Sequence, residues 1–553
     1  MTQTMDTQMV QISVSTDVLV VGGGYAGLVT ALEIADAGYP VILVANGGAV
    51  EDNDSATLTG VDDAGKEALG RLVQRVAAES RVEVMLETRL AGAAGVAGDF
   101  TVWLAGKEEV SERKVGAVVV AGSLEIRVLN EAYGLTLSET VVSQSRFEAL
   151  LADKPGSLAG KTVAFVVGFG QEGNPLVMER VLSAVSAAAD VEDCTVYVYV
   201  NNIKVAEDGL ERFYLQGRDK GAIYFKLTQM PLVSQTEDAL AVGFTDPVLR
   251  RAMELVPDMI VVEEAIVASS DNPALADLLR IKQGAADFLQ TENVHNYPVR
   301  SNREGVFVVG ASRGVGRLGG ALTDAGNAAL AVRGLLGDGT VTVPADQAVV
   351  DEGKCTICLT CYRCCPHGAI YWESDKAVIS PVACQGCGIC ASECPMDAIQ
   401  IGRYTDTAMN GQVRERLAEG DDDLKIVAFC CQNSALEAGV MADTFNMPLP
   451  VGLKTIQVPC AGKIDIEYIM NAFTEGADGV LVLACHFGNC KSEQGNTFAS
   501  WRVEDAQRML AAAGLEKERL CFATLASNMG SDFSSIAMDL SARLKELGPS
   551  PAK

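Results

Sequence analysis

The chain has 553 residues, with 72 acidic and 44 basic side chains and a net charge of −28. This charge argues against nucleic-acid binding, because contact with phosphates needs a basic surface. The length allows three or four domains, each with its own core. Fifteen of the 16 cysteines lie between Cys355 and Cys521, which does not fit a small disulfide-stapled secreted protein and indicates metal binding in a reducing compartment.

The start of the chain has no charged and apolar segment typical of a secretion signal. No apolar stretch approaches the ~18–20 residues needed to span a bilayer. We therefore expect a cytoplasmic protein with no membrane span of its own, for which any membrane contact is made by a partner.

The first strong motif is a glycine-rich turn. Residues 17–21 (DVLVV) predict a buried parallel strand, which runs into GGGYAG and then a helical segment. In this context Gly22 permits the turn, Gly24 lets a pyrophosphate approach the backbone, and Gly27 lets the helix pack on the strand. Residues 40–45 complete the βαβ unit, so the sequence predicts a dinucleotide-binding domain.

The acidic residue that usually ends the second strand and holds the ribose is missing here. Asn46 stands in its place, and Asn46 or Glu51 are the candidate substitutes. A Rossmann-like unit that binds nothing is the alternative. Against it, residues 304–336 predict a strand ending at Gly310, a glycine-rich loop and a helix, the way two-dinucleotide-binding flavoproteins close their FAD domain. We expect an FAD-binding domain over residues 1–345.

An inserted subdomain is expected at about 158–290. Its residues 162–173 (TVAFVVGFGQEG) repeat the pattern of a strand followed by glycines. This repeat could open a nicotinamide site. A structural βαβ corner is favoured, because no acidic ribose partner follows the next strand at 196–200.

Two cysteine runs with the spacing Cys-x2-Cys-x2-Cys-x3-Cys-Pro mark residues 346–405 as a ferredoxin domain with two 4Fe-4S clusters. In this arrangement the fourth cysteine of each run ligates the other cluster. A zinc ribbon, which lacks the Cys-Pro endings, is the alternative. Cys364 is surplus, and His367 is expected to be structural. The first cluster is assigned to Cys355, Cys358, Cys361 and Cys394, and the second to Cys384, Cys387, Cys390 and Cys365.

After an acidic linker at 406–424, residues 425–553 alternate strands and helices as in a doubly wound parallel sheet. Cysteines follow three of its strands, at the edge where such sheets bind ligands. Cys430 is expected to face away from Cys431, Cys521 to pack in the core, and His486 is an alternative ligand. Zinc is the alternative metal. We assign a 2Fe-2S cluster to Cys431, Cys460, Cys485 and Cys490.

The flavin fingerprint comes first, the two-cluster ferredoxin next and the cysteine-bearing α/β domain last. With its domains in this order, the chain resembles the HdrA-type subunit of heterodisulfide reductase, fused to a domain similar to the delta subunit of methyl-viologen-reducing hydrogenase. It is also similar to the QmoB-type subunit of the quinone-interacting oxidoreductase of sulfate reducers. The resemblance rests on VVGGGYAG, the two Cys-Pro runs, VYVYVNNIKVAEDGLERFYLQGRDKGAIYF, FCCQNSA, VPCAGKID, GADGVLVLACHFGNC and ERL. It departs in the inserted region, where only Cys194 is present, so we expect no further cluster there.

The resemblance implies an α/β protein with an FAD-binding Rossmann-like domain, a two-cluster ferredoxin domain and a flavodoxin-like iron–sulfur domain. It implies an anaerobic oxidoreductase subunit that relays electrons between flavin and clusters inside a hetero-oligomer of redox subunits. The alternatives are a free-standing NAD(P)H-dependent iron–sulfur flavoprotein and a zinc scaffold with a relic Rossmann domain.

Overall fold

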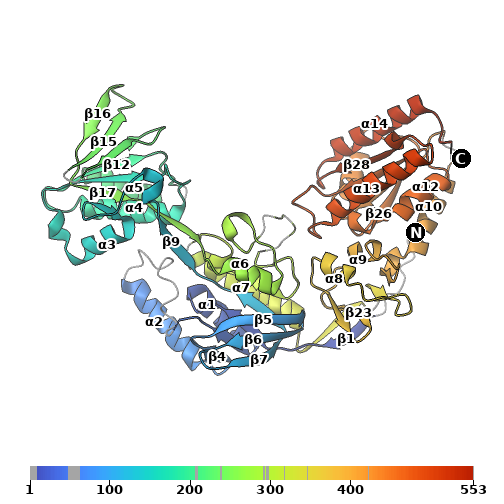
Figure 1. Cartoon of the computed structure of the whole chain (residues 1–553), viewed down its shortest axis with the longest axis horizontal. Coiled ribbons are helices and arrows are strands. Elements are labelled where there is room, and N and C mark those ends of the chain that lie inside the picture. The colour runs from blue at the N-terminus through green and yellow to red at the C-terminus, as the bar shows by residue number, and fades with distance from the viewer. Residues whose placement is uncertain are drawn as a thin grey trace.

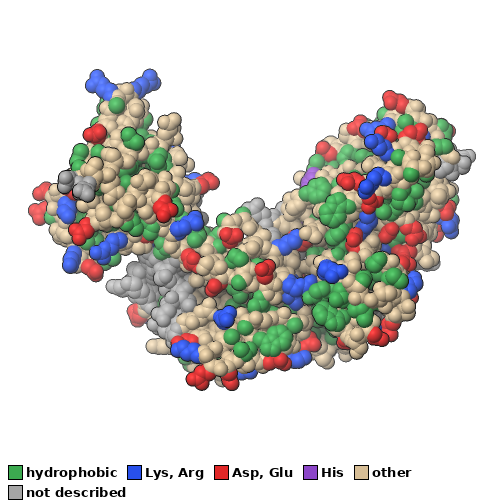
Figure 2. Space-filling model, in the orientation of Figure 1, with side chains coloured by type: hydrophobic (Ala, Val, Ile, Leu, Met, Phe, Trp, Pro, Cys, Tyr) green, Lys and Arg blue, Asp and Glu red, His purple; other side chains and the backbone are tan. Residues whose placement is uncertain are grey.

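The structure is a computed structural model that describes residues 9–47, 63–205, 209–236, 239–290, 293, 295, 298–316, 318–344, 347–420 and 423–551. An N-terminal part lies in the middle of the molecule, with an inserted part at one end and the ferredoxin-like and C-terminal parts at the other (Figure 1). An open notch separates these two ends in the view of Figure 2. Within the described residues, no helix is long and apolar enough to cross a membrane.

The N-terminal part is built on a parallel five-stranded sheet in the order β19-β8-β2-β3-β4. Its inner strands are short apolar runs and are almost fully buried, as expected for strands covered on both faces. Helices α1 and α7 pack together in the core on one face, and the sheet β5-β6-β7 shares the core on the other. The strand β1 pairs with β20. The strands are β1 (Met9–Ser13), β2 (Val18–Val21), β3 (Val41–Val44), β4 (Val82–Met85), β5 (Arg89–Val96), β6 (Asp99–Ala105), β7 (Val110–Val115), β8 (Ala117–Val120), β19 (Val306–Val308) and β20 (Thr340–Pro344), and the helices are α1 (Tyr25–Asp36), α2 (Asp63–Ala78), α6 (Asn272–Leu279) and α7 (Leu318–Leu336).

The inserted part has a second parallel sheet in the order β10-β17-β11-β12-β13 and a small antiparallel sheet β14-β15-β16. Two antiparallel strands, β9 and β18, connect it to the N-terminal part. The sheet starts before residue 158, because β10 pairs with β17. In contrast, α6 contributes to the N-terminal core. The elements are β9 (Leu124–Val128), β10 (Val141–Ser143), α3 (Gln144–Asp153), β11 (Thr162–Val167), α4 (Pro175–Ala188), β12 (Thr195–Val200), α5 (Leu210–Asp219), β13 (Ile223–Lys226), β14 (Leu232–Gln235), β15 (Leu240–Thr245), β16 (Ala252–Leu255), β17 (Met259–Val262) and β18 (Glu264–Ala268).

The ferredoxin-like part consists of short elements around the cysteine runs: β21 (Val349–Val350), α8 (Thr360–Cys364), β22 (Ile370–Glu373), β23 (Lys376–Ile379), α9 (Ile389–Ser392) and β24 (Ile399–Gln400). Strand β21 pairs with β24, so the segment before the first run is tied to the segment after the second.

The C-terminal part is a parallel four-stranded sheet in the order β26-β25-β27-β28, covered by helices on both faces. Much of the expected linker is a helix, α10, because Met409, Val413 and Leu417 recur every four residues and bury one face in this core. The elements are α10 (Asp406–Ala418), β25 (Ile426–Cys431), α11 (Ala435–Thr444), β26 (Leu453–Val458), α12 (Ile466–Thr474), β27 (Gly479–Ala484), α13 (Gly495–Ala512), β28 (Leu520–Thr524) and α14 (Gly530–Leu547), with a short 3-10 helix η7 (Ala461–Lys463) after β26.

Candidate flavin and cluster sites

The first glycine turn joins β2 to α1 in a close-packed corner. Gly22 has a φ of +122°, and a Cβ there would lie 2.0 Å from the carbonyl oxygen of Ala121. A Cβ on Gly27 would lie 1.8 Å from the oxygen of Gly22. Gly24 is the N-cap residue of α1, where no side chain caps the helix and no acidic residue lies in the first turn. This leaves the helix N-terminus suited to the pyrophosphate of FAD.

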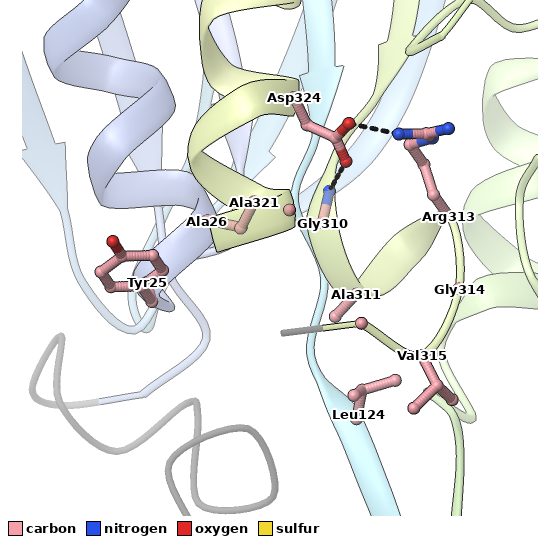
Figure 3. Close-up of a pocket in the computed structure, with 12 residues that line it drawn as sticks. Tyr25, Ala26, Leu124, Gly310, Ala311, Arg313, Gly314, Val315, Ala321 and Asp324 are labelled. Atoms are coloured by element: carbon pink, nitrogen blue, oxygen red, sulfur yellow. Dashed lines mark hydrogen bonds and ion pairs between the residues drawn. The ribbon is translucent and has the colours of Figure 1, made fainter. Parts of the chain in front are cut away.

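A cavity of about 260 Å³ opens beside this corner, between α1, the loop after β19 and the start of α7 (Figure 3). Asp324 on α7 accepts a hydrogen bond from the amide of Gly310, at 2.9 Å, and forms an ion pair with Arg313. Gly310 has a φ of +55°, and its missing side chain leaves room for Ala26. The sequence predicted Gly310, whereas the pair Asp324–Arg313 was missed because neither residue belongs to a recognised motif.

A second, smaller cavity of about 70 Å³ is lined by Gly22, Gly23 and Gly24 of the glycine turn. Asn46, at the end of β3, lines it together with Asp271, and its amide nitrogen lies 3.4 Å from a carboxylate oxygen of Asp271. Glu51, the other expected substitute for the ribose ligand, lies outside the described residues. Both cavities border the turn and the start of α1, which suits an extended molecule such as FAD.

The glycine loop of the inserted part has a different chemistry, because its amides have partners within the chain. The amide of Gly168 donates to the carboxylate of Glu263 at 2.9 Å, and the amides of Phe169 and Gly170 donate to the hydroxyl of Tyr133 at 3.2 and 3.0 Å. Tyr133 in turn donates to Glu263, and both side chains are buried. Burial, followed by the charge of Glu263, raises the pKa of Tyr133 well above its usual value.

Next to this loop a cavity of about 400 Å³ is lined by Asn201, Asn202 and Lys204. Lys204 is paired with Glu172. No acidic residue lies at the end of β12, where a ribose would be held.

The structure brings the ferredoxin cysteines together in the two crossed sets expected from their spacing. One set lines a small cavity of about 20 Å³. In the other, burial is the main cause of a raised pKa, to about 11 for Cys384 and about 12 for Cys387, and the charge of the neighbouring Cys365 adds to both. Thiols crowded and buried in this way need a cation to become thiolates together, which is what iron supplies. The first set is Cys355, Cys358, Cys361 and Cys394, and the second is Cys384, Cys387, Cys390 and Cys365.

The four tail cysteines converge at the carboxyl ends of β25, β26 and β27. The sulfurs of Cys431 and Cys485 lie 3.7 Å apart. Cys460 and Cys490 complete a ring of neighbouring sulfurs, and all four are buried. A hydrogen bond with Cys431, followed by one with Cys490, raises the pKa of Cys460 well above that of a free thiol, because a sulfur beside thiolates holds its proton.

Gly495, at the start of α13, makes room for these sulfurs, since a Cβ there would lie 2.3 Å from the Sγ of Cys460. Within the described residues, no three or more His, Cys, Asp or Glu side chains are already arranged around one point as the ligands of a single ion.

His486 is turned away from this ring. Its Nδ1 lies 2.9 Å from the hydroxyl of Thr524, and its Nε2 lies 3.2 Å from the sulfur of Met529. Cys430 lies in the core on the opposite face of the sheet from Cys431, as the strand alternation predicts. Cys521 packs against that same core.

The second ferredoxin set lies directly against the tail site. Helix α9, which carries Cys390, packs on η7, the turn that follows Cys460: a Cβ on Gly462 would lie 2.5 Å from the side chain of Ile389. The buried Lys463 lies across Gly388, and its ammonium pairs with Asp406 at 3.0 Å. These contacts fix the two cysteine sets beside one another, and sequence spacing alone did not indicate them.

The comparisons with known proteins agree with this layout. Residues 426–548 match the family model of the methyl-viologen-reducing hydrogenase delta subunit. The vhu iron-sulfur subunit of the F420-non-reducing hydrogenase of Methanocaldococcus jannaschii is 35% identical over 131 residues, which cover 24% of this chain and 98% of that protein. The chain belongs to the delta-subunit family through this C-terminal domain.

The part before the delta-subunit domain has relatives of its own. Residues 17–95 match an FAD binding domain and residues 377–400 a 4Fe-4S binding domain. One subunit of the CoB-CoM heterodisulfide reductase of Methanosarcina acetivorans, named as dependent on ferredoxin or F420H2, is 26% identical over 466 residues, or 80% of this chain. The match spans 58% of that relative's length. Among solved structures, thioredoxin reductase of Lactococcus lactis aligns with 58% of this chain and 98% of its own at 16% identity, with a TM-score of 0.41.

The predicted relationship is thus confirmed: a chain similar to the HdrA-type subunit of heterodisulfide reductase carries a delta-subunit domain at its end. The chain is an α/β protein with an FAD-binding Rossmann-like fold and a 4Fe-4S ferredoxin motif.

Proposed function

We propose that the chain is an electron-transfer subunit of an anaerobic redox complex, with one FAD, two 4Fe-4S clusters and one 2Fe-2S cluster. The observation that carries the proposal is the packing of α9 on η7, which sets the thiols of the second ferredoxin set beside the tail thiols. Such proximity is what a relay between clusters needs. Flavin and clusters would supply the redox chemistry, the flavin exchanging electrons in pairs and the clusters one at a time.

The protein's own groups hold and orient these cofactors. Gly22, Gly24 and Gly27 shape the turn for the pyrophosphate, and Gly310 borders the larger cavity for the flavin end of FAD. Asn293 of the N-terminal part donates to the carbonyl of Cys490 at 2.7 Å. The flavin-binding part and the tail site are therefore held together, which suits a fixed electron path.

The hydrogen bonds of the second glycine loop speak against NAD(P)H as the donor. Its amides are the groups that would donate to a pyrophosphate. Here they donate instead to Glu263 and Tyr133. We therefore propose that electrons enter or leave through partner subunits. Support for this comes from the relatives of both parts, which are named as subunits of larger enzymes.

Anaerobic purification with metal and flavin analysis tests the proposal. We expect about ten irons and one FAD per chain. Cys485→Ser is expected to remove about two irons, and Cys430→Ser, on the opposite face of the sheet, to remove none. Zinc in place of iron, or folded protein that binds no flavin, would contradict the proposal. A native pull-down under the same conditions identifies the partners.

A further inference from the structure

The smaller cavity beside the glycine turn contains an acceptor without a donor. Asn272 is only 1% exposed, and it lines this cavity with Asp271. Its amide nitrogen donates to the carbonyl oxygen of Asp287 at 3.0 Å, but its Oδ1 has no hydrogen-bond partner among the described residues. A buried acceptor left without a donor destabilises the fold, so its presence in a cavity indicates a ligand that donates to it.

The chain holds this acceptor in place from several sides. Before α6, the amide of Ser270 donates to the carboxylate of Glu125 at 2.7 Å, which fixes the turn between β18 and the helix. At the other end of α6, the guanidinium of Arg303 donates to the carbonyl of Leu279 at 2.7 Å. Asn272 therefore points into the cavity from a helix that is tied down at both ends.

Asp271 supplies the carboxylate that the second strand lacks. Asn46 occupies the strand end where Rossmann-like sites carry Asp or Glu, and its amide lies against the carboxylate of Asp271. The two residues are 225 positions apart in the chain, so the acidic group reaches the site from a different segment. In the part of the chain that the structure describes, Asp271 has no basic partner, which leaves its oxygens available as acceptors.

We propose that Asp271 and Asn272 accept hydrogen bonds from the hydroxyls of the adenosine ribose of FAD. This inference rests on the proposed binding of FAD and assigns the ribose contact within it. The ribose lies at the cavity beside Asn46, the pyrophosphate at the glycine turn, and the flavin end toward Gly310. The site thus recognises a sugar with free hydroxyls by a carboxylate and an amide oxygen.

The test uses the full-length chain, freed of flavin and titrated with FAD or with an FAD analogue that carries 2′-deoxyadenosine. Binding is followed by flavin fluorescence. We expect the wild-type chain to bind the deoxy analogue about tenfold more weakly, a difference equivalent to about 1.4 kcal/mol. Asp271→Ala and Asn272→Ala should each bind FAD about tenfold more weakly and reduce this discrimination, since the lost hydroxyl then has one acceptor fewer. Asp271→Asn, which keeps an acceptor oxygen, should restore most of it.

Asp277→Ala is the matched control, because Asp277 is exposed on the same helix and does not line the cavity. It should bind both flavins as the wild type does. Unchanged FAD affinity in the Asp271 and Asn272 variants, or weaker binding with the discrimination fully retained, would overturn the inference. A wild-type chain that binds no FAD would refute the proposed function itself, and that result is read separately from the discrimination.

Discussion

The corner between Gly310 and α1 can be tested by adding one methyl group. In Gly310→Ala the new Cβ would lie 2.5 Å from the Cβ of Ala26, in the first turn of α1. Ordinary carbon contacts start near 3.5 Å, so the helix or the loop must shift by about 1 Å. The same substitution also places alanine at a φ of +55°, in the left-handed region.

The expected cost follows from these two effects. Left-handed backbone costs a residue with a Cβ roughly 1–2 kcal/mol, and overpacking costs about 1–3 kcal/mol. We expect the free energy of unfolding of the flavin-free chain to fall by about 2–5 kcal/mol. Because the displaced helix turn borders the glycine corner, we also expect FAD affinity to fall at least about tenfold, which corresponds to 1.4 kcal/mol.

Flavin titration and thermal unfolding measure these effects, with Gly326→Ala as the control. Gly326 lies within α7 and is partly exposed, and a Cβ there would meet no atom within 4 Å. That variant should bind FAD normally and be as stable as the wild type or slightly more stable, because alanine favours helix. Normal FAD affinity and stability in Gly310→Ala would refute the packing argument.

Three further predictions concern other parts of the chain. Cys365→Ser should abolish the spectroscopic signal of one 4Fe-4S cluster, whereas Cys364→Ser, at the adjacent residue, should leave the signals of both clusters unchanged. Loss of a cluster signal in Cys364→Ser as well would show that Cys364 is a ligand. NADH should not bleach the flavin of the wild-type chain, and bleaching would show that the loop binds nucleotide. Glu263→Ala, which removes the acceptor of the Gly168 amide and of the Tyr133 hydroxyl, should lower the melting temperature. Burial raises the pKa of Asp406, but its hydrogen bonds and the Lys463 ammonium outweigh burial and hold that pKa at about 2. The carboxylate therefore stabilises the fold above pH ~4, and this stabilisation is lost as the pH falls toward 2. In Lys463→Met, acid-unfolding curves should show this loss beginning at a higher pH.

Local motifs could be predicted from the sequence because their chemistry is contained in a few adjacent residues. The strand, turn and helix around Gly22 and the two Cys-Pro runs are of this kind. The pairing of β10 with β17 was not foreseen, because a three-residue strand carries almost no pattern of its own. The linker was expected from its acidic composition, yet the spacing of Met409 and Leu417 already indicated the helix that forms there.

The parts of the site that were missed come from residues far apart in the chain. Asp271 reaches the end of β3 only because β18 leads into α6 at the edge of the glycine turn. Glu263, the residue that follows β17 of the inserted sheet, closes the second glycine loop. A single sequence contains no signal for such contacts, since they depend on which strands become neighbours.

The crossed arrangement of the ferredoxin cysteines has a consequence for how the protein matures. Cys365 lies with the second run and Cys394 with the first, so neither set is complete until both runs have folded against one another. Under the proposed ligation, each cluster takes three thiolates from one run and its fourth from the other run. Whichever cluster binds first therefore joins the two runs and stabilises the arrangement that also presents the ligands of the other cluster.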